Sequence, residues 1–129
     1  MADKTISRLT ILAYWVVTAI LSALMVLLGI GYITGGQFRD AFHHLGFPDY
    51  FRLELGIAKL AGAIALLAPI PKKLKEWTYA GFGITFISGF IAHLSSGDPA
   101  SRAAGPLFAL LLLLISYTAY QRRGARGGE

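Results

Sequence analysis

The sequence contains no cysteine among its 129 residues. Disulfide exchange, thiolate metal sites and cysteine nucleophiles are therefore excluded. Histidine is also scarce, with three residues, and no two of them have the i, i+4 spacing of a helical metal site. The adjacent His43 and His44 would diverge by about 100° on a helix, so we expect no metal centre. Any redox role would require a bound cofactor or a partner subunit.

Charged residues are nearly absent from four long apolar stretches, at about residues 9–33, 51–70, 77–95 and 103–120. The whole chain is 55% hydrophobic, with a mean hydropathy of +0.58. Each stretch is close to the ~20 residues that a helix needs to cross a bilayer. A soluble bundle would need polar helix faces, and the first stretch is too long for a signal peptide. The sequence predicts an all-α integral membrane protein, with one domain over residues 1–129 that forms an antiparallel bundle of four transmembrane helices.

Most basic residues lie on one side of this predicted membrane. Eight of the twelve do so: Lys4, Arg8, Lys72, Lys73, Lys75, Arg122, Arg123 and Arg126. The positive-inside rule then places both termini in the cytoplasm. The net charge of +5 follows from this topology and from contact with anionic lipid head groups, so nucleic-acid binding is not needed to explain it.

The loop between the first two stretches contains a short amphipathic segment. Phe38, Phe42 and Leu45 recur at helical spacing, and His43 and His44 lie on the opposite side. We expect a short helix at the outer membrane interface, which acts either as a connector or as a lid over the mouth of the bundle.

Two ionisable side chains lie inside the second stretch. Lys59 lies about eight residues from its outer end, or roughly 12 Å deep, where a charge costs roughly 3 kcal/mol. Glu54 lies closer to that end, and Arg52 is close enough to reach the lipid head groups. Glu54 and Lys59 are five positions apart, which is a poor spacing for a pair on one helix. His93 in the third stretch lies at nearly the depth of Glu54, so we expect Glu54, Lys59 and His93 to cluster in the outer half of the bundle.

Other polar residues are candidates for the same pocket. His43 or His44 could close it from above. Tyr14, Thr18 and Ser22 recur at i, i+4 and i+8 of the first stretch, a pattern more typical of a packing face than of a site. The predicted ligand-binding residues are Glu54, Lys59, His93, Tyr14, Thr18, His43 and His44.

Four motifs follow one another along roughly residues 46–99, namely LGFPDYF, ELGIAKLAG, LKEWTYAGF and IAHLSSGDP. In this order and spacing they resemble the DoxX-like family of small bacterial membrane proteins with four spans. The resemblance implies a place in the bacterial inner membrane and an association with membrane oxidoreductases. It singles out Glu54, Lys59, Lys75, Glu76, Trp77, His93, Gly97 and Asp98.

Three functions are open at this point. The first is a non-enzymatic accessory or assembly subunit that binds a quinone-like or isoprenoid lipid and associates with a membrane redox complex, another membrane protein or a second copy of itself. The second is an intramembrane isomerase or hydratase, in which Glu54 and His93 act as acid and base and Lys59 stabilises negative charge. The third is a proton-coupled exporter of the small multidrug type. That class carries a carboxylate in its first span, and the first stretch here has none.

Overall fold

The computed structural model describes the backbone of residues 2–126 and the side chains of residues 8–122. Its helices, in chain order, are α1 (Ala2–Thr34), α2 (Gln37–His44), α3 (Asp49–Leu67), α4 (Lys72–Ser95) and α5 (Ala100–Arg126). No strand occurs in this part of the chain. The all-α prediction is confirmed, because each apolar stretch corresponds to one long helix. The amphipathic segment forms the short helix α2.

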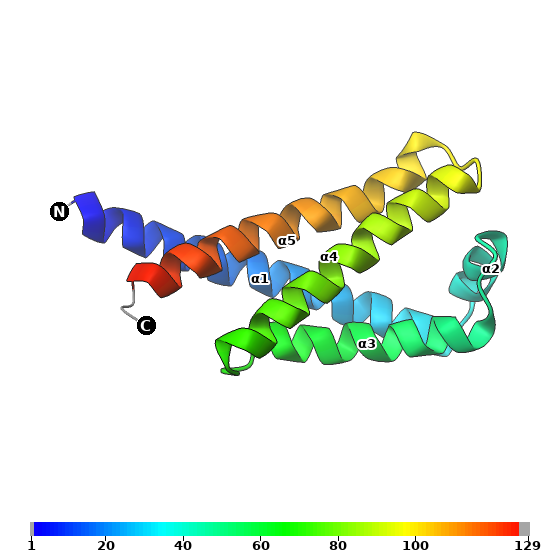
Figure 1. The fold of residues 1–129 in the computed structure, drawn as a ribbon. Coiled ribbons are helices and arrows are strands. Elements are labelled where there is room, and N and C mark those ends of the chain that lie inside the picture. The colour runs from blue at the N-terminus through cyan, green and yellow to red at the C-terminus, as the bar shows by residue number, and fades with distance from the viewer. Residues whose placement is uncertain (1, 127–129) are drawn as a thin grey trace.

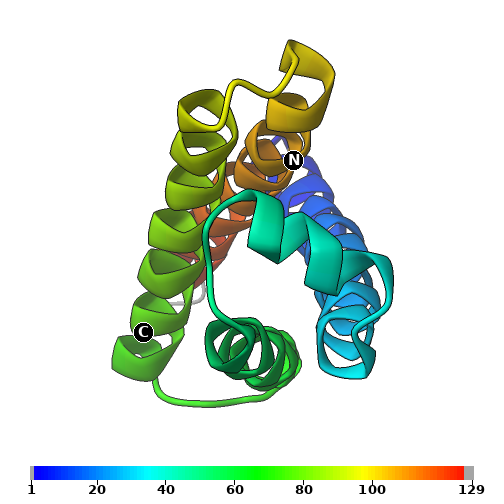
Figure 2. The same ribbon diagram turned by 90° about the vertical axis from the view of Figure 1, so that its right-hand side faces the viewer.

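The long helices form an antiparallel bundle in which three pairs of helices pack closely. α1 packs against both α3 and α5, and α4 packs against α5 (Figure 1). α3 and α4 are joined by a short turn at residues 68–71, and they diverge toward the opposite end of the bundle. Figure 2 shows α2 lying across that end. Below, "outer" means the end covered by α2, and "inner" means the end where α3 and α4 meet.

Two helices are long and apolar enough to cross a membrane by length and composition, over Arg8–Thr34 and Ala100–Arg122. α3 has charged residues at four of its 19 positions, and α4 begins with a basic turn. These charges lower the apolar character of the middle helices. The prediction of four spans therefore depends on how α3 and α4 accommodate their charges.

The seam between α1 and α3 is closed by backbone contact. A Cβ atom at Gly29 would lie 2.9 Å from the carbonyl oxygen of Gly56, and one at Gly56 would lie 3.0 Å from the carbonyl oxygen of Gly29. Only glycine leaves room for such an approach, which is a common device for packing helices in membranes. The closed seam fixes the position of α3, on which the candidate site depends.

The inner ends of α3 and α4 are fastened by a buried lysine. Pro69 has no N–H group to donate to the carbonyl of Ala65, so the last turn of α3 is left with an unpaired acceptor. Lys75 of α4 donates from Nζ to the carbonyl oxygens of Ala65, Leu66 and Ala68, each at 2.8 Å. A cation at a helix C-terminus is also favoured by the helix dipole. The turn between α3 and α4 is thereby held closed at its base.

Candidate binding site between α3 and α4

Two adjoining cavities lie where α3 and α4 diverge, and together we call them the α3–α4 cleft. The outer chamber has a volume of about 360 Å³ and the inner chamber about 340 Å³. Leu55, Lys59 and Thr85 line both chambers. Lys59 therefore lies at the junction of the cleft.

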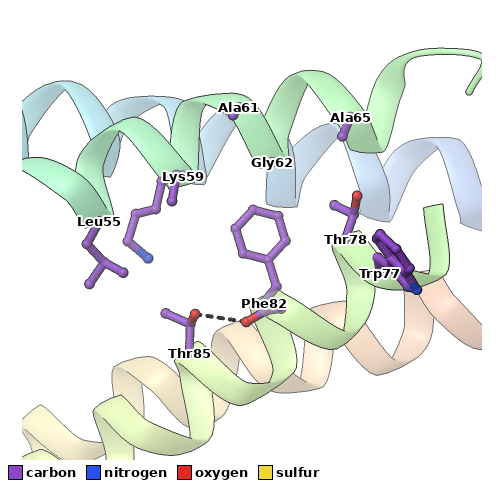
Figure 3. A pocket seen from close by; sticks show the side chains of 11 residues that line it. Leu55, Lys59, Ala61, Gly62, Ala65, Trp77, Thr78, Phe82 and Thr85 are labelled. Carbon is purple, nitrogen blue, oxygen red and sulfur yellow. Dashed lines mark hydrogen bonds between the residues drawn. The ribbon is translucent and has the colours of Figure 1, made fainter. Parts of the chain in front are cut away.

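The inner chamber is lined by small residues of α3 and by one face of α4 (Figure 3). Ala58, Ala61 and Gly81 have exposed surfaces along it, so the chamber is open on one side. A Cβ atom at Gly81 would meet nothing within 4 Å. By contrast, the ring of Phe82 covers Gly62 so closely that a Cβ atom there would collide with it. The small residues thus leave space between α3 and α4 instead of bringing these helices together.

The outer chamber is aromatic and is roofed by α2. Phe42 of α2 is buried, and its ring centroid lies 4.9 Å from that of Tyr32 on α1. Phe47 and Phe51 continue this wall, with ring centroids 5.0 Å apart. The predicted amphipathic helix therefore covers one chamber of the site with its apolar face.

Lys59 is buried at this junction, with 4% of its surface exposed. Its Nζ lies 3.8 Å from Sδ of Met25, a weak acceptor, and 5.4 Å from the ring centroids of Tyr32 and Phe86. Among the described residues it makes no hydrogen bond or ion pair with an oxygen atom. Figure 3 shows the ammonium group directed into the space between α3 and α4. The sequence correctly identified Lys59 as a buried charge.

Glu54 does not join Lys59. Its side chain is exposed, it lines neither chamber, and it has no hydrogen bond or ion pair with any described residue. Five positions along a helix correspond to a rotation of about 140°, which directs Glu54 away from the side where Lys59 enters the cleft. The expected cluster of Glu54, Lys59 and His93 is therefore not formed.

His93 lines the outer chamber together with Lys59, but its hydrogen-bond partner is Asp98. A nitrogen of the His93 ring, Nδ1, donates to Oδ2 of Asp98 at 2.7 Å, and Nε2 of His44 donates to Oδ1 at 2.6 Å. These hydrogen bonds, that of His93 first, lower the pKa of the Asp98 carboxyl group. Asp98 thus links α4 to the lid helix α2. The sequence offered a signal in the GD pair, because Gly97 adopts a left-handed φ of 75° that returns the chain toward His93.

The remaining predicted residues lie elsewhere. His43 pairs with Asp49 at 3.0 Å on the outer surface, not over the chamber. Tyr14 and Thr18 are buried in the core and line neither chamber. Thr18 and the hydroxyl of Tyr79 each lie 2.6 Å from Oγ of Ser116, so this network joins α1, α4 and α5. The polar stripe on α1 is therefore a packing face, as its pattern indicated.

Arg52 does not reach toward lipid head groups, contrary to expectation. It is 2% exposed, donates to the carbonyl oxygen of Tyr32, and has Nη2 at 3.8 Å from Oδ1 of Asp49. The carboxylate three positions earlier on the helix was the signal for this inward orientation. Arg52 thereby connects the outer end of α3 to α1.

Comparison with known proteins identifies the family of the chain. Neither the curated proteins nor the solved structures contain a match. The sequence profile of the DoxX-like family matches residues 5–116, which include the lid helix, the Asp98 turn and every residue that lines the α3–α4 cleft. Since this match covers most of the chain, the protein belongs to the DoxX-like family.

Proposed function

We propose that the protein is a non-enzymatic membrane subunit that binds a quinone-like or isoprenoid lipid in the α3–α4 cleft. In this proposal it spans a bacterial inner membrane four times, with both termini in the cytoplasm. It serves as an accessory or assembly subunit for a membrane oxidoreductase or another membrane protein, or as a homo-oligomer.

The observation that carries the proposal is Lys59. A buried lysine without an oxygen acceptor from the described residues is costly in an apolar environment. A ligand oxygen at the chamber junction would supply the missing acceptor. Quinone carbonyls and the polar ends of isoprenoid lipids both carry such an oxygen.

The shape of the cleft supports an elongated apolar ligand. Binding cavities for small molecules usually measure about 300–1,000 Å³, and each chamber alone is near the lower limit. The two chambers adjoin at Lys59, so a chain could extend from a polar end at the junction. The exposed Ala58, Ala61 and Gly81 give a lateral opening through which a lipid could enter from the bilayer.

The environment of the charged residues supports four spans. α3 has 19 residues, or about 28 Å at 1.5 Å per residue, close to the hydrocarbon thickness of a bilayer. Its buried charges, Arg52 and Lys59, are turned toward protein. Lys75 is buried on the inner turn, and Trp77 next to it is exposed, as expected for an aromatic residue at a membrane interface.

The two alternative functions receive less support from this geometry. An enzyme that uses Glu54 and His93 together needs both at one reacting centre, but His93 is bonded to Asp98 and Glu54 is exposed outside the cleft. A proton-coupled exporter needs a carboxylate in its first span, and residues 8–34 contain none.

The test is lipid analysis of the purified protein. The wild type, Lys59→Met and a matched control, Lys73→Met, would be isolated from bacterial membranes and their extracted lipids compared by mass spectrometry. Lys73 is exposed in the first turn of α4 and lines neither chamber. We expect one quinone or isoprenoid species to be enriched with the wild type and Lys73→Met, and lost from Lys59→Met. Equal lipid content in all three proteins would contradict the proposal, and affinity capture of the wild type from the same membranes would identify its partners.

A further inference from the structure

We infer that the polar end of the ligand is a singly charged carboxylate, so that the α3–α4 cleft selects a lipid acid over an uncharged lipid. This inference rests on the proposed function only in that the α3–α4 cleft binds a lipid. Of the two ligand classes proposed above, it disfavours an uncharged quinone and favours a lipid, isoprenoid or other, that ends in a carboxylate. It is drawn from the charges that line the two chambers.

The lining of the cleft is positively charged and has no counter-charge. Among the residues that line the two chambers the ionisable side chains are Lys59, His93 and Tyr32, and none is an aspartate or glutamate. His93 already has the carboxylate of Asp98 as its partner at 2.7 Å. Lys59 is thus left with one positive charge that no described residue neutralises.

An uncharged ligand would meet only part of this need. A carbonyl or hydroxyl oxygen accepts a hydrogen bond, but it leaves a net charge in an apolar cavity, and burying an unpaired charge is far more costly than burying an ion pair. A carboxylate provides both the acceptor and the opposite charge, and hydrogen bonds between charged partners are roughly twice as strong as neutral ones. A phosphate monoester would carry about −1.5 to −2 charges and would overcompensate a single ammonium group.

The lining of the two chambers indicates how the ligand is oriented. Thr85 borders both chambers beside Lys59, and Ser88 adds a hydroxyl group to the outer chamber, whereas the α3 side of the inner chamber consists mainly of small apolar residues. The open side of the cleft is also on the inner chamber. We therefore place the carboxylate at Lys59, facing outward, and the hydrocarbon chain in the inner chamber beside Trp77.

Trp77 makes this arrangement measurable. The chain has two tryptophans, so Trp15→Phe leaves Trp77 as the single emitter. Bromine atoms quench tryptophan fluorescence on contact, and 9,10-dibromostearic acid and its methyl ester differ only in the charge of the head. Trp15→Phe protein in phosphatidylcholine nanodiscs would be titrated with each probe. The acid should half-quench Trp77 at a concentration at least about tenfold below that of the ester.

Variants at Lys59 separate this inference from the proposed function. In Lys59→Met the acid should lose its advantage, whereas Lys59→Arg and the control Lys73→Met should keep it. Equal quenching by acid and ester in the Trp15→Phe protein, or a preference that survives Lys59→Met, would overturn the inference while leaving lipid binding in place. Absence of quenching by either probe would overturn both. The comparison of the two probes is made on protein that retains Lys59, so it decides the question even if Lys59→Met fails to fold.

Discussion

α3 has glycines on its side toward α1 and on its side toward α4, but only the interface with α1 is closely packed. Toward α1, Gly56 faces Gly29, and the two backbones come into contact. Toward α4, Gly62 faces the ring of Phe82, and Gly81 faces open space. Small residues on one helix allow close packing only when the residues opposite them on the facing helix are also small. Where the partner is bulky or inclined away, the same residues leave a cavity.

This difference accounts for the position of the candidate site. The closed α1–α3 seam and the Lys75 cap fix α3 at two places, while its other side remains separated from α4. Lys59 lies between the two seams, because its ammonium contacts Met25 of α1 and also borders both chambers. The charge is therefore held by a rigid helix and presented to a cavity.

The largest effect should come from breaking the closed seam. In Gly56→Val the new side chain would press on the carbonyl of Gly29 and on the side chains of Tyr32 and Ile33, each about 3.0 Å from the added Cβ. Overpacking of this kind costs about 3 kcal/mol. We expect a corresponding fall in the free energy of unfolding, measured by denaturant titration in detergent. The matched control is Gly81→Val, at the open seam, which should change stability by less than about 0.5 kcal/mol. Equal losses in the two variants would show that the seams do not differ.

A smaller effect should come from loosening the point where the open seam closes. Lys75→Met removes three hydrogen bonds to carbonyl oxygens at the end of α3. Hydrogen bonds that involve a charged group contribute about 1.5–3 kcal/mol, so we expect a loss of about 2 kcal/mol in the same titration. The control Lys73→Met, two positions away and exposed, should be neutral. A stable Lys75→Met protein would mean that the turn holds α3 and α4 together without the lysine.

The smallest effect on stability should come from breaking the hydrogen bonds that connect α2 to the turn after α4. Asp98→Ala removes the acceptor shared by His93 and His44, and with it the link between α2 and the turn after α4. Hydrogen exchange of residues 37–44 should become faster, while exchange in α3 stays unchanged. Asp40→Ala on α2 is the control, because Asp40 is exposed and does not line the outer chamber. Unchanged exchange in Asp98→Ala would show that α2 is held by its aromatic face alone.

The same link gives a dependence on pH with a defined sign. The pKa of Asp98 is lowered by its hydrogen bonds with His93 and His44. A lowered pKa stabilises the folded form above the unfolded value of about 3.9, and this contribution is lost as the pH falls through the folded pKa. Protection of α2 should therefore persist at neutral pH and decline only below about pH 4, and this step should be absent from Asp98→Ala.

The sequence predicted the positions of the helices and the burial of Lys59 better than it predicted how each helix is rotated about its axis. Long apolar stretches locate the helices, and the cost of a buried charge identifies Lys59 without any structure. Depth alone, however, paired Glu54 with His93, although the two side chains leave their helices in different directions. Arg52 was misplaced for a similar reason, because its inward partner, the Tyr32 carbonyl, belongs to a helix whose rotation the sequence does not specify.

The space between α3 and α4 was also beyond the reach of sequence patterns. The recurrence of Gly81, Thr85, Gly89 and His93 on one face of α4 favours close approach of another helix, but in the structure these residues line the cleft. The outcome depends on the ring of Phe82 and on the inclination of α4, which tertiary packing determines. The Lys75 cap depends in the same way on the geometry of the turn that contains Pro69.

The most direct test is an experimental structure of the wild-type protein isolated from its own membrane in a lipid nanodisc. We predict elongated density in the α3–α4 cleft, with a polar atom within about 3 Å of Nζ of Lys59. Close packing of α3 on α4 without such density, or a protein carboxylate bonded to Lys59, would contradict this prediction.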